Sequence, residues 1–275
     1  MRVGRIHILK FARDMGIPPD TVELDYVQSW VLFGLSQTDL FDALAFKGGT
    51  CLKKAYFKDY RFSKDLDFTL LNDLSVKGLM NSIEESLTSA TNGCGIDFWI
   101  DKFESGERTF YVKVKWISIL SGRDRKLEIN ITTLGNEFLT NNYPKRSVIH
   151  EPYNSIEKDY HAELPCYTLE EILAEKIRTL FERGGRTGAW PKDLYDVWML
   201  KGRVNLNDML RTLTKKLELR GIKIDVDKLM ERKDILDQKW EESLKNLIPR
   251  YDLPNFNNVF SDVVEFIRNL EGKLK

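Results

Sequence analysis

The segment FKGGTCLKKAYFKDYRFSKDLDFTL, residues 46–70, constrains the fold more than any other part of this sequence. From residue 61 its pattern has a period of two. The apolar residues of DLDFTL point to one face, and Asp65 and Asp67 point to the other. This alternation predicts a half-buried strand whose polar face carries two carboxylates.

The residues before this strand indicate a tight turn next to a helix. Gly48 and Gly49 allow close backbone approach. Thr50 would stand at the N-terminus of a helix predicted over Cys51–Phe57, where backbone N–H groups attract phosphate. An isolated Gly-Gly is usually only a turn, and an isolated Asp-x-Asp is usually a solvated strand face. The ordered combination of turn, hydroxyl, helix and paired carboxylates favours a site that handles phosphate.

The paired carboxylates also predict a cation. Asp65 and Asp67 share a face about 7 Å apart, and two such charges ~6 Å apart repel by ~3 kcal/mol at an effective dielectric constant of about 20. Mg²⁺ prefers oxygen ligands and usually takes one or two carboxylates together with phosphate oxygens. Magnesium is therefore the expected cofactor, with Mn²⁺ as the alternative.

A third acidic residue follows in a later strand pattern. The alternation in Lys126–Thr132 buries its apolar residues and puts Glu128 and Asn130 on the opposite face. If this strand neighbours the one with the paired aspartates, Glu128 completes an acidic trio. The alternative is a cross-strand ion pair from Glu128 to Lys113 or Lys115.

The remaining periodicity predicts two parts of different character. Before residue 165 we expect helices over 21–44 and 73–90, and strands over 110–120 and 126–132 joined by a hairpin turn at 121–124. After it the pattern is helical throughout, and Thr168 and Glu171 have the spacing of a capping box. We therefore predict a domain over residues 1–164 and a helical C-terminal domain over 165–275.

Composition narrows the function classes. The 42 Lys and Arg residues balance the 42 Asp and Glu residues, so attraction to nucleic acid must come from a local patch. The three cysteines show no C-x-x-C or zinc-ligand spacing, which fits a reducing compartment. No apolar run approaches the ~18 residues that a membrane span needs. We expect a cytoplasmic protein without a membrane partner.

The motifs FKGGTCLKKAYF and RFSKDLDF resemble the signature of the AbiEii/AbiGii toxin family of the nucleotidyltransferase superfamily. The later motifs of that family are matched by EEILAEK at 170–176 and KDLYD at 192–196, so the resemblance spans roughly residues 20–200. The expected fold class is α+β: a nucleotidyltransferase-like mixed β-sheet flanked by helices, with a C-terminal helical bundle.

The resemblance implies a metal-dependent nucleotidyltransferase that moves a nucleoside monophosphate from a nucleoside triphosphate to an acceptor. The implied acceptor is RNA, at the tRNA 3′ end. The implied role is a growth-inhibiting toxin of a toxin–antitoxin or phage-defence system, opposed by an antitoxin from a neighbouring gene. The alternatives are transfer to a small molecule such as an aminoglycoside, and a non-catalytic nucleotide-binding module. An RNA acceptor predicts a basic surface leading to the aspartates, whereas a small acceptor predicts an enclosed pocket.

Together, residue chemistry and resemblance give a set of expected site residues. The expected catalytic residues are Asp65, Asp67, Glu128, Lys176 and Asp193, of which Asp65, Asp67 and Glu128 would also bind the metal. The expected nucleotide-binding residues are Gly48, Gly49, Thr50, Lys53, Ser63, Lys176, Arg183 and Asp196.

The expectation for Lys176 also has a physical basis. This lysine falls beside the buried stripe of its helix, so its ammonium group must find an anion or extend to solvent. Asp193 and Asp196 are one helical turn apart, and the resemblance implies that one of them, with Asp193 favoured, faces the active site. The basic connector over 183–192 would hold a triphosphate or an RNA backbone, or would be a plain surface loop.

Overall fold

The computed structural model describes residues 1–133, 143–182, 190–249 and 252–274. These residues form two compact units: an N-terminal unit up to Tyr167 and a C-terminal unit from Thr168. The assignment of residues 1–164 and 165–275 to two separate domains stays a prediction, because compactness does not show that either part folds by itself.

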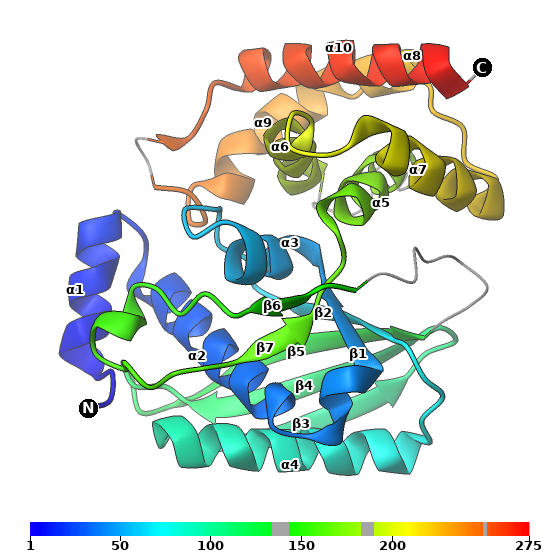
Figure 1. Ribbon diagram of the computed structural model, residues 1–275. Coiled ribbons are helices and arrows are strands. Elements are labelled where there is room, and N and C mark those ends of the chain that lie inside the picture. The colour runs from blue at the N-terminus through cyan, green and yellow to red at the C-terminus, as the bar shows by residue number, and fades with distance from the viewer. Residues whose placement is uncertain (134–142, 183–189, 250–251, 275) are drawn as a thin grey trace. The chain divides into compact units, whose positions relative to one another are not determined.

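A five-stranded sheet in the order β1-β2-β5-β4-β3 forms the centre of the N-terminal unit (Figure 1). Its strands are β1 (Leu44–Lys47), β2 (Leu66–Leu70), β3 (Phe98–Ser105), β4 (Thr109–Ile117) and β5 (Asp124–Thr133). β2 and β5 run parallel, and the other neighbouring pairs run antiparallel. A two-stranded ribbon, β6 (Lys145–Ser147) with β7 (Glu163–Pro165), completes the strands described. The mixed sheet confirms the predicted fold class.

Helices pack beside this sheet. α2 (Pro19–Ser36) packs against α4 (Val76–Cys94), and α1 (Arg5–Met15) packs against α2. α4 runs along the sheet and contacts β3 (Figure 1). The apolar residues of β2 and β5, such as Phe68 and Ile131, are fully buried. The alternate residues of both strands are therefore left for the polar face.

The helix after the glycines begins earlier than the sequence predicts. α3 (Gly48–Cys51) starts at Gly48 and continues into a wider turn over Leu52–Tyr56, in which the Phe57 N–H donates to the Leu52 carbonyl at 2.8 Å. The predicted start at Cys51 is wrong. Glycine normally disfavours helices, so the sequence gives no sign that the helix includes Gly48 and Gly49. Here the first turn contains both glycines, and Thr50 lies inside the helix.

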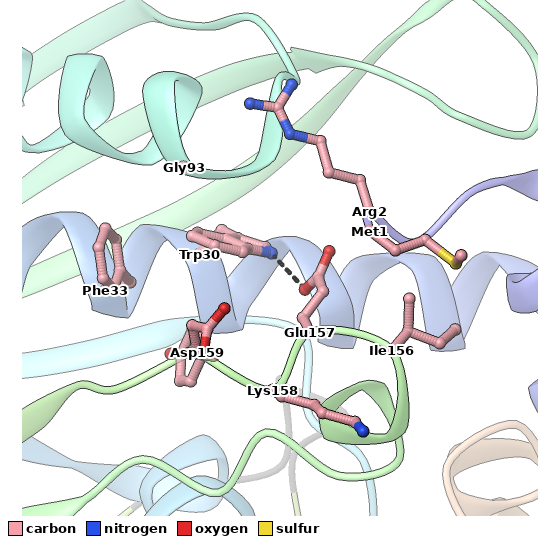
Figure 2. Close-up of a pocket in the computed structure, with 10 residues that line it drawn as sticks. Met1, Arg2, Trp30, Phe33, Gly93, Ile156, Glu157, Lys158 and Asp159 are labelled. Atoms are coloured by element: carbon pink, nitrogen blue, oxygen red, sulfur yellow. Dashed lines mark hydrogen bonds between the residues drawn. The ribbon is translucent and has the colours of Figure 1, made fainter.

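A cavity of about 420 Å³ lies in the N-terminal unit between α2 and the loop of residues 156–160 (Figure 2). Trp30 and Phe33 from α2 and Glu157 and Tyr160 from the loop contribute to its lining. No residue of the expected active site lines this cavity.

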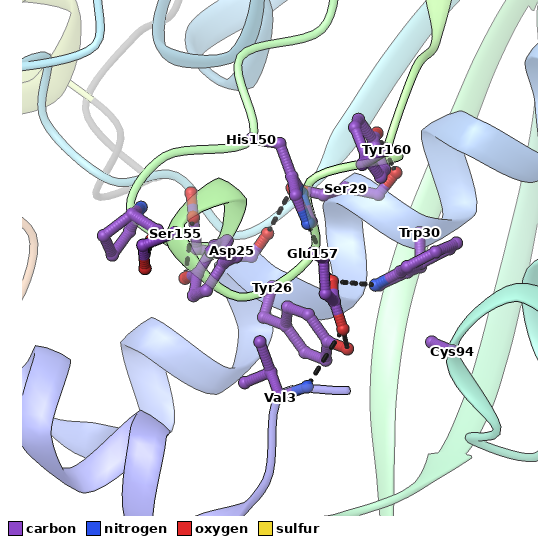
Figure 3. A network of polar contacts seen from close by, with 12 residues as sticks. Val3, Asp25, Tyr26, Ser29, Trp30, Cys94, His150, Ser155, Glu157 and Tyr160 are labelled. Carbon is purple, nitrogen blue, oxygen red and sulfur yellow. Dashed lines mark hydrogen bonds and ion pairs between the residues drawn. The ribbon is translucent and has the colours of Figure 1, made fainter. Parts of the chain in front are cut away.

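The Glu157 carboxylate next to this cavity holds three separate segments together (Figure 3). It accepts hydrogen bonds from the Val3 N–H at 3.0 Å, the Tyr26 hydroxyl at 2.7 Å and Trp30 Nε1 at 3.2 Å. His150 Nε2 lies 2.8 Å from its second oxygen. Burial opposes the ionisation of Glu157, but the hydrogen bonds from His150, Tyr26 and Val3 outweigh it and lower its pKa.

A second buried charge pair joins α2 to the turn after α3. Lys54 Nζ is 2.6 Å from Asp25 Oδ2, and both side chains are at most 2% exposed. Ser29 Oγ accepts from the same ammonium at 2.8 Å, and the Tyr153 hydroxyl donates to Asp25 at 3.0 Å. Burial lowers the pKa of Lys54 to about 8, and the Asp25 carboxylate works against that shift.

The C-terminal unit is helical, as the sequence predicts. Its helices are α5 (Leu169–Glu182), α6 (Trp190–Leu200), α7 (Leu206–Arg220), α8 (Val226–Met230), α9 (Lys233–Leu244) and α10 (Phe256–Leu274). α5 packs against α6 and α7, and α10 packs against α6, α8 and α9. Thr168 Oγ1 accepts from the Glu171 N–H at 3.3 Å, as in a capping box, whereas the Glu171 side chain pairs with Lys216 at 3.0 Å. Within the described residues, none of the helices has the length and apolar character that crossing a membrane requires.

We expect Lys54→Met to lower the free energy of unfolding by about 3–5 kcal/mol, because it leaves the Asp25 carboxylate buried without its cation. The double variant Asp25→Asn/Lys54→Met should be more stable than Lys54→Met alone, since it removes both charges. Urea unfolding measures each value. The exposed Lys58→Met is the control and should change stability by at most about 0.5 kcal/mol. A double variant less stable than the single one would contradict this account.

The Glu157 carboxylate also predicts a pH dependence. Burial lowers the pKa of His150, and the pKa of Glu157 is lowered as described. The unfolded chain therefore takes up protons more readily than the folded chain, so stability should fall as pH drops below about 6.5 for the histidine and again below about 4.3 for the glutamate. Urea unfolding between pH 7 and 4 should show a shallower acid loss for Glu157→Gln than for wild type. The exposed Glu84→Gln should follow the wild-type curve, and a Glu157→Gln curve parallel to wild type would count against the argument.

Candidate active site

One row of side chains crosses the polar face of the sheet. Lys47 of β1 lies opposite Asp67 of β2, and Asp67 lies opposite Asn130 of β5. Register partners on neighbouring strands share a face. Asn130 Nδ2 donates a hydrogen bond to Asp67 Oδ1 at 3.0 Å. The row therefore fixes the orientation of one of the two predicted aspartates.

The glycine turn packs directly against this aspartate. Gly48 has a φ of 79°, and a Cβ built on it would lie 2.6 Å from Asp67 Oδ2. A Cβ on Gly49 would lie 2.8 Å from Arg61 Nη2 and 3.1 Å from Ser63 Oγ. Both positions need glycine, one for backbone conformation and space and the other for space alone. The structure thus brings together Gly48, Gly49, Ser63 and Asp67 from the predicted set.

Two other predicted residues are engaged within the protein. Thr50 Oγ1 donates to the Asp65 carbonyl at 2.5 Å, so this hydroxyl ties the helix to the segment that enters β2. Lys53 Nζ donates to the Lys58 carbonyl at 3.1 Å and lies 4.1 Å from the centroid of the Phe62 ring. The nucleotide-binding roles of Thr50 and Lys53 stay predictions.

The remaining acidic residues lie at the start of the parallel ladder. Asp65 and Glu128 each directly precede a residue of its first pair, Leu66 and Ile129. Asp65 is half-buried and Glu128 is exposed. Glu128 lies opposite Lys113, but in the described part of the chain it forms no ion pair. The cross-strand alternative considered for Glu128 is thus not seen among these residues.

The carboxylates do not by themselves make a closed metal centre. Among the residues that the structure describes, no three or more His, Cys, Asp or Glu side chains are grouped so that they alone would hold an ion. The metal-binding roles of Asp65, Asp67 and Glu128 therefore stay predictions, and such a site would need further oxygen ligands.

The predicted lysine of the C-terminal unit is held between two carboxylates. Lys176 Nζ lies 2.7 Å from Asp193 Oδ1 and 2.8 Å from Asp196 Oδ2. Thr179 Oγ1 lies 3.4 Å from the second Asp193 oxygen. Both aspartates thus supply the anion that the sequence demands for this lysine. Arg183, also predicted to bind nucleotide, lies outside the described residues.

Sequence reasoning did not assign four residues around the row: Lys47, Thr69, Thr132 and Tyr167. Lys47 Nζ donates to Thr132 Oγ1 at 3.4 Å and lies 5.6 Å from the centroid of the Tyr167 ring. The Tyr167 hydroxyl lies 2.6 Å from Thr69 Oγ1. Lys47 stands directly before the glycines, and that position was the available signal. Its orientation depends on the pairing of β1, a strand too short to show an alternation.

Comparison with known proteins identifies the family of this chain. A family model described as nucleotidyl transferase AbiEii toxin of type IV toxin–antitoxin systems matches residues 30–262. The chain belongs to this family. It is therefore a nucleotidyltransferase of the AbiEii toxin type, as the sequence motifs predict. No curated protein matches the chain in sequence.

Solved structures share the fold of this AbiEii family member. The nucleotidyltransferase toxin MenT4 from Mycobacterium tuberculosis H37Rv superposes with a TM-score of 0.65 at 18% identity, over 99% of this chain and 93% of MenT4. The crystal structure of JHP933 from Helicobacter pylori gives a TM-score of 0.59 at 17% identity, over 94% of each chain. At these identities the likeness shows the fold alone.

We expect Gly48→Ala to lower nucleotidyl transfer at least ~10-fold, because the new Cβ would push Asp67 out of position. The matched control is Gly122→Ala, since Gly122 also has a positive φ of 67° but a Cβ added there would meet nothing within 4 Å. Both variants should share the backbone cost of about 1–2 kcal/mol, and only Gly48→Ala should lose activity at a temperature where both are folded. Equal activities of the two variants would contradict the assigned packing.

Proposed function

We propose that this AbiEii family member transfers a nucleoside monophosphate from a nucleoside triphosphate to the 3′ end of an RNA, with tRNA as the acceptor. The observation that carries the proposal is the contact of the glycine turn with Asp67 on the polar face. A backbone without side chains can approach phosphate there, next to a carboxylate held by Asn130. Neither feature is needed for a sheet that serves only as a scaffold.

The donor set fits a hard divalent cation. Asp67 presents carboxylate oxygen, Asp65 stands one side-chain repeat away, and the triphosphate would supply the other oxygen ligands that Mg²⁺ or Mn²⁺ prefers. When bound, the ion would polarise the α-phosphate and offset its charge. Asn130 fixes the Asp67 carboxylate through the 3.0 Å hydrogen bond, which pre-orients this ligand.

The chain's own residues then have distinct tasks. The Gly48–Gly49 backbone seats the β- and γ-phosphates at the first turn of α3. The acceptor hydroxyl oxygen forms a bond to the α-phosphorus while the bond to the bridging oxygen breaks, and pyrophosphate leaves. Glu128 lies one side-chain repeat from Asn130 on β5, about 7 Å away, and accepts the hydroxyl proton. The roles of Lys176, Asp193 and Asp196 stay predictions from the family resemblance.

The biological role follows from the family description. A type IV toxin acts against growth and has a cognate antitoxin, which we expect to be the product of a neighbouring gene. We propose action in the cytoplasm, where nucleoside triphosphates and tRNA are present, and a contribution to phage defence. Asp67 lies half-buried on a sheet face. We therefore favour a macromolecular acceptor over a small molecule, which would need an enclosed pocket.

Labelling distinguishes the proposed transfer from its alternatives. The protein is incubated with each α-³²P-labelled nucleoside triphosphate, Mg²⁺ and total RNA. We expect label on RNA and a loss of at least ~10²-fold in Asp67→Asn, since the cation that would offset the charge on the α-phosphate loses a carboxylate ligand. The exposed Asp59→Asn is the matched control and should retain activity, while EDTA should abolish it. Label on an aminoglycoside instead, or nucleotide binding without transfer to any acceptor, would overturn the proposal.

A further inference from the structure

The polar row across the sheet does not end at Asn130. The next strand, β4, places Tyr111 opposite Asn130, on the same face. Tyr111 is therefore two strand spacings from β2, about 10 Å. The side chain in direct line with the Asp67–Asn130 pair is thus an aromatic ring.

The Tyr111 ring is exposed to solvent. Tyr111 is 46% exposed, although its strand neighbours Phe110 and Val112 are buried on the other face. Within the described ranges its hydroxyl makes no hydrogen bond. The tyrosine ring therefore offers an apolar face and a polar hydroxyl to a molecule that binds beside the polar row.

A cation stands one side-chain repeat from this ring. Lys113 follows Tyr111 on the same face of β4 and lies opposite Lys102 of β3. Lys102 pairs with Glu104. The pKa of Glu104 is lowered mainly by its contact with Lys102 and to a smaller extent by the charge of Lys113. Lys113 makes no ion pair or side-chain hydrogen bond with any residue that the structure describes, so it can bind an anion without breaking a direct contact.

We infer that Tyr111 and Lys113 bind the 3′-terminal nucleotides of a single-stranded RNA acceptor. The ring stacks on a base, which is sequence-tolerant because every base has a π-face, and Lys113 contacts a backbone phosphate. This inference rests on the proposed function and names the surface that its acceptor uses.

The geometry of the reaction supports approach of the RNA to Asp67 from the β4 side. Gly48 and Gly49, which follow β1 on one side of Asp67, form the proposed triphosphate seat, whereas Tyr111 lies on the β4 side. In phosphoryl transfer the attacking and leaving oxygens are roughly in line on opposite sides of phosphorus. A triphosphate on one side of Asp67 and an RNA end on the other meet this requirement.

The test uses the full chain and steady-state kinetics with tRNA and with the preferred labelled triphosphate. We expect Tyr111→Ala to raise the KM for RNA about 5- to 100-fold, the range of one base–aromatic stack, and to leave the KM for the triphosphate unchanged. Tyr111→Phe should retain the wild-type KM, since stacking needs the ring. Trp99→Ala is the matched control: Trp99 is 38% exposed on the same face, but on the edge strand β3 opposite Lys115.

Salt dependence tests the lysine separately. Lys113→Gln should weaken RNA binding and reduce the slope of log Kd against log salt by about 0.7, the value for one phosphate of a single strand. Lys77→Gln removes the same charge from the exposed surface of α4 and should leave the slope unchanged. Fluorescence anisotropy of a labelled tRNA acceptor-end oligonucleotide measures both.

The outcomes separate this inference from the proposed function. If wild type labels RNA and Tyr111→Ala keeps the wild-type KM for RNA, the inference fails and the proposed function stands. An equal effect of Trp99→Ala, or a raised KM for the triphosphate in Tyr111→Ala, also overturns it. If wild type labels no RNA at all, the proposed function fails and the inference fails with it.

Discussion

The parallel pairing of β2 with β5 is the constraint on which the candidate site depends. Asp67 and Asn130 are 63 residues apart in the chain, and their hydrogen bond exists only because these two strands are neighbours in one register. Parallel strands cannot be joined by a tight turn. The connection here contains α4 and the strands β3 and β4, so a correct site requires that all of this intervening structure has packed. The geometry of the candidate site therefore depends on formation of the core of this unit.

The sheet uses its two faces for opposite purposes. One face buries Phe68, Ile131 and their apolar neighbours, and the other carries the half-buried polar residues Lys47, Asp67 and Asn130. A ligand can reach a site on the polar face, but the residues of that face contribute less hydrophobic burial to stability. The unit also buries charge, but its buried carboxylates Glu23, Asp25 and Glu157 each have donors aimed at them. Satisfied polar groups of this kind select one arrangement of the segments that they join.

The sequence predicts much of this fold because alternation is a strong signal where one face is buried. β2, β4 and β5 have that pattern, and the C-terminal helices have apolar stripes. β3 was missed because none of its residues is fully buried, and β1 because its four residues are too few to show a period. The glycines and aspartates of the site were visible as a motif. The internal contacts of Thr50 and Lys53 were not, because their partners, the Asp65 and Lys58 carbonyls, are backbone atoms that a residue pattern does not reveal.

The Glu157 carboxylate has a consequence for how the chain is made. Its donors Tyr26 and Trp30 lie 131 and 127 residues upstream, so on a translating ribosome α2 emerges on the order of ten seconds before the residue that completes its polar contacts. During that interval the Tyr26 hydroxyl and Trp30 Nε1 must donate their hydrogen bonds to water. The contacts between α2 and Glu157 therefore form only after the loop that follows β6 has been synthesised. The last strand of the unit, β7, is synthesised directly after that loop.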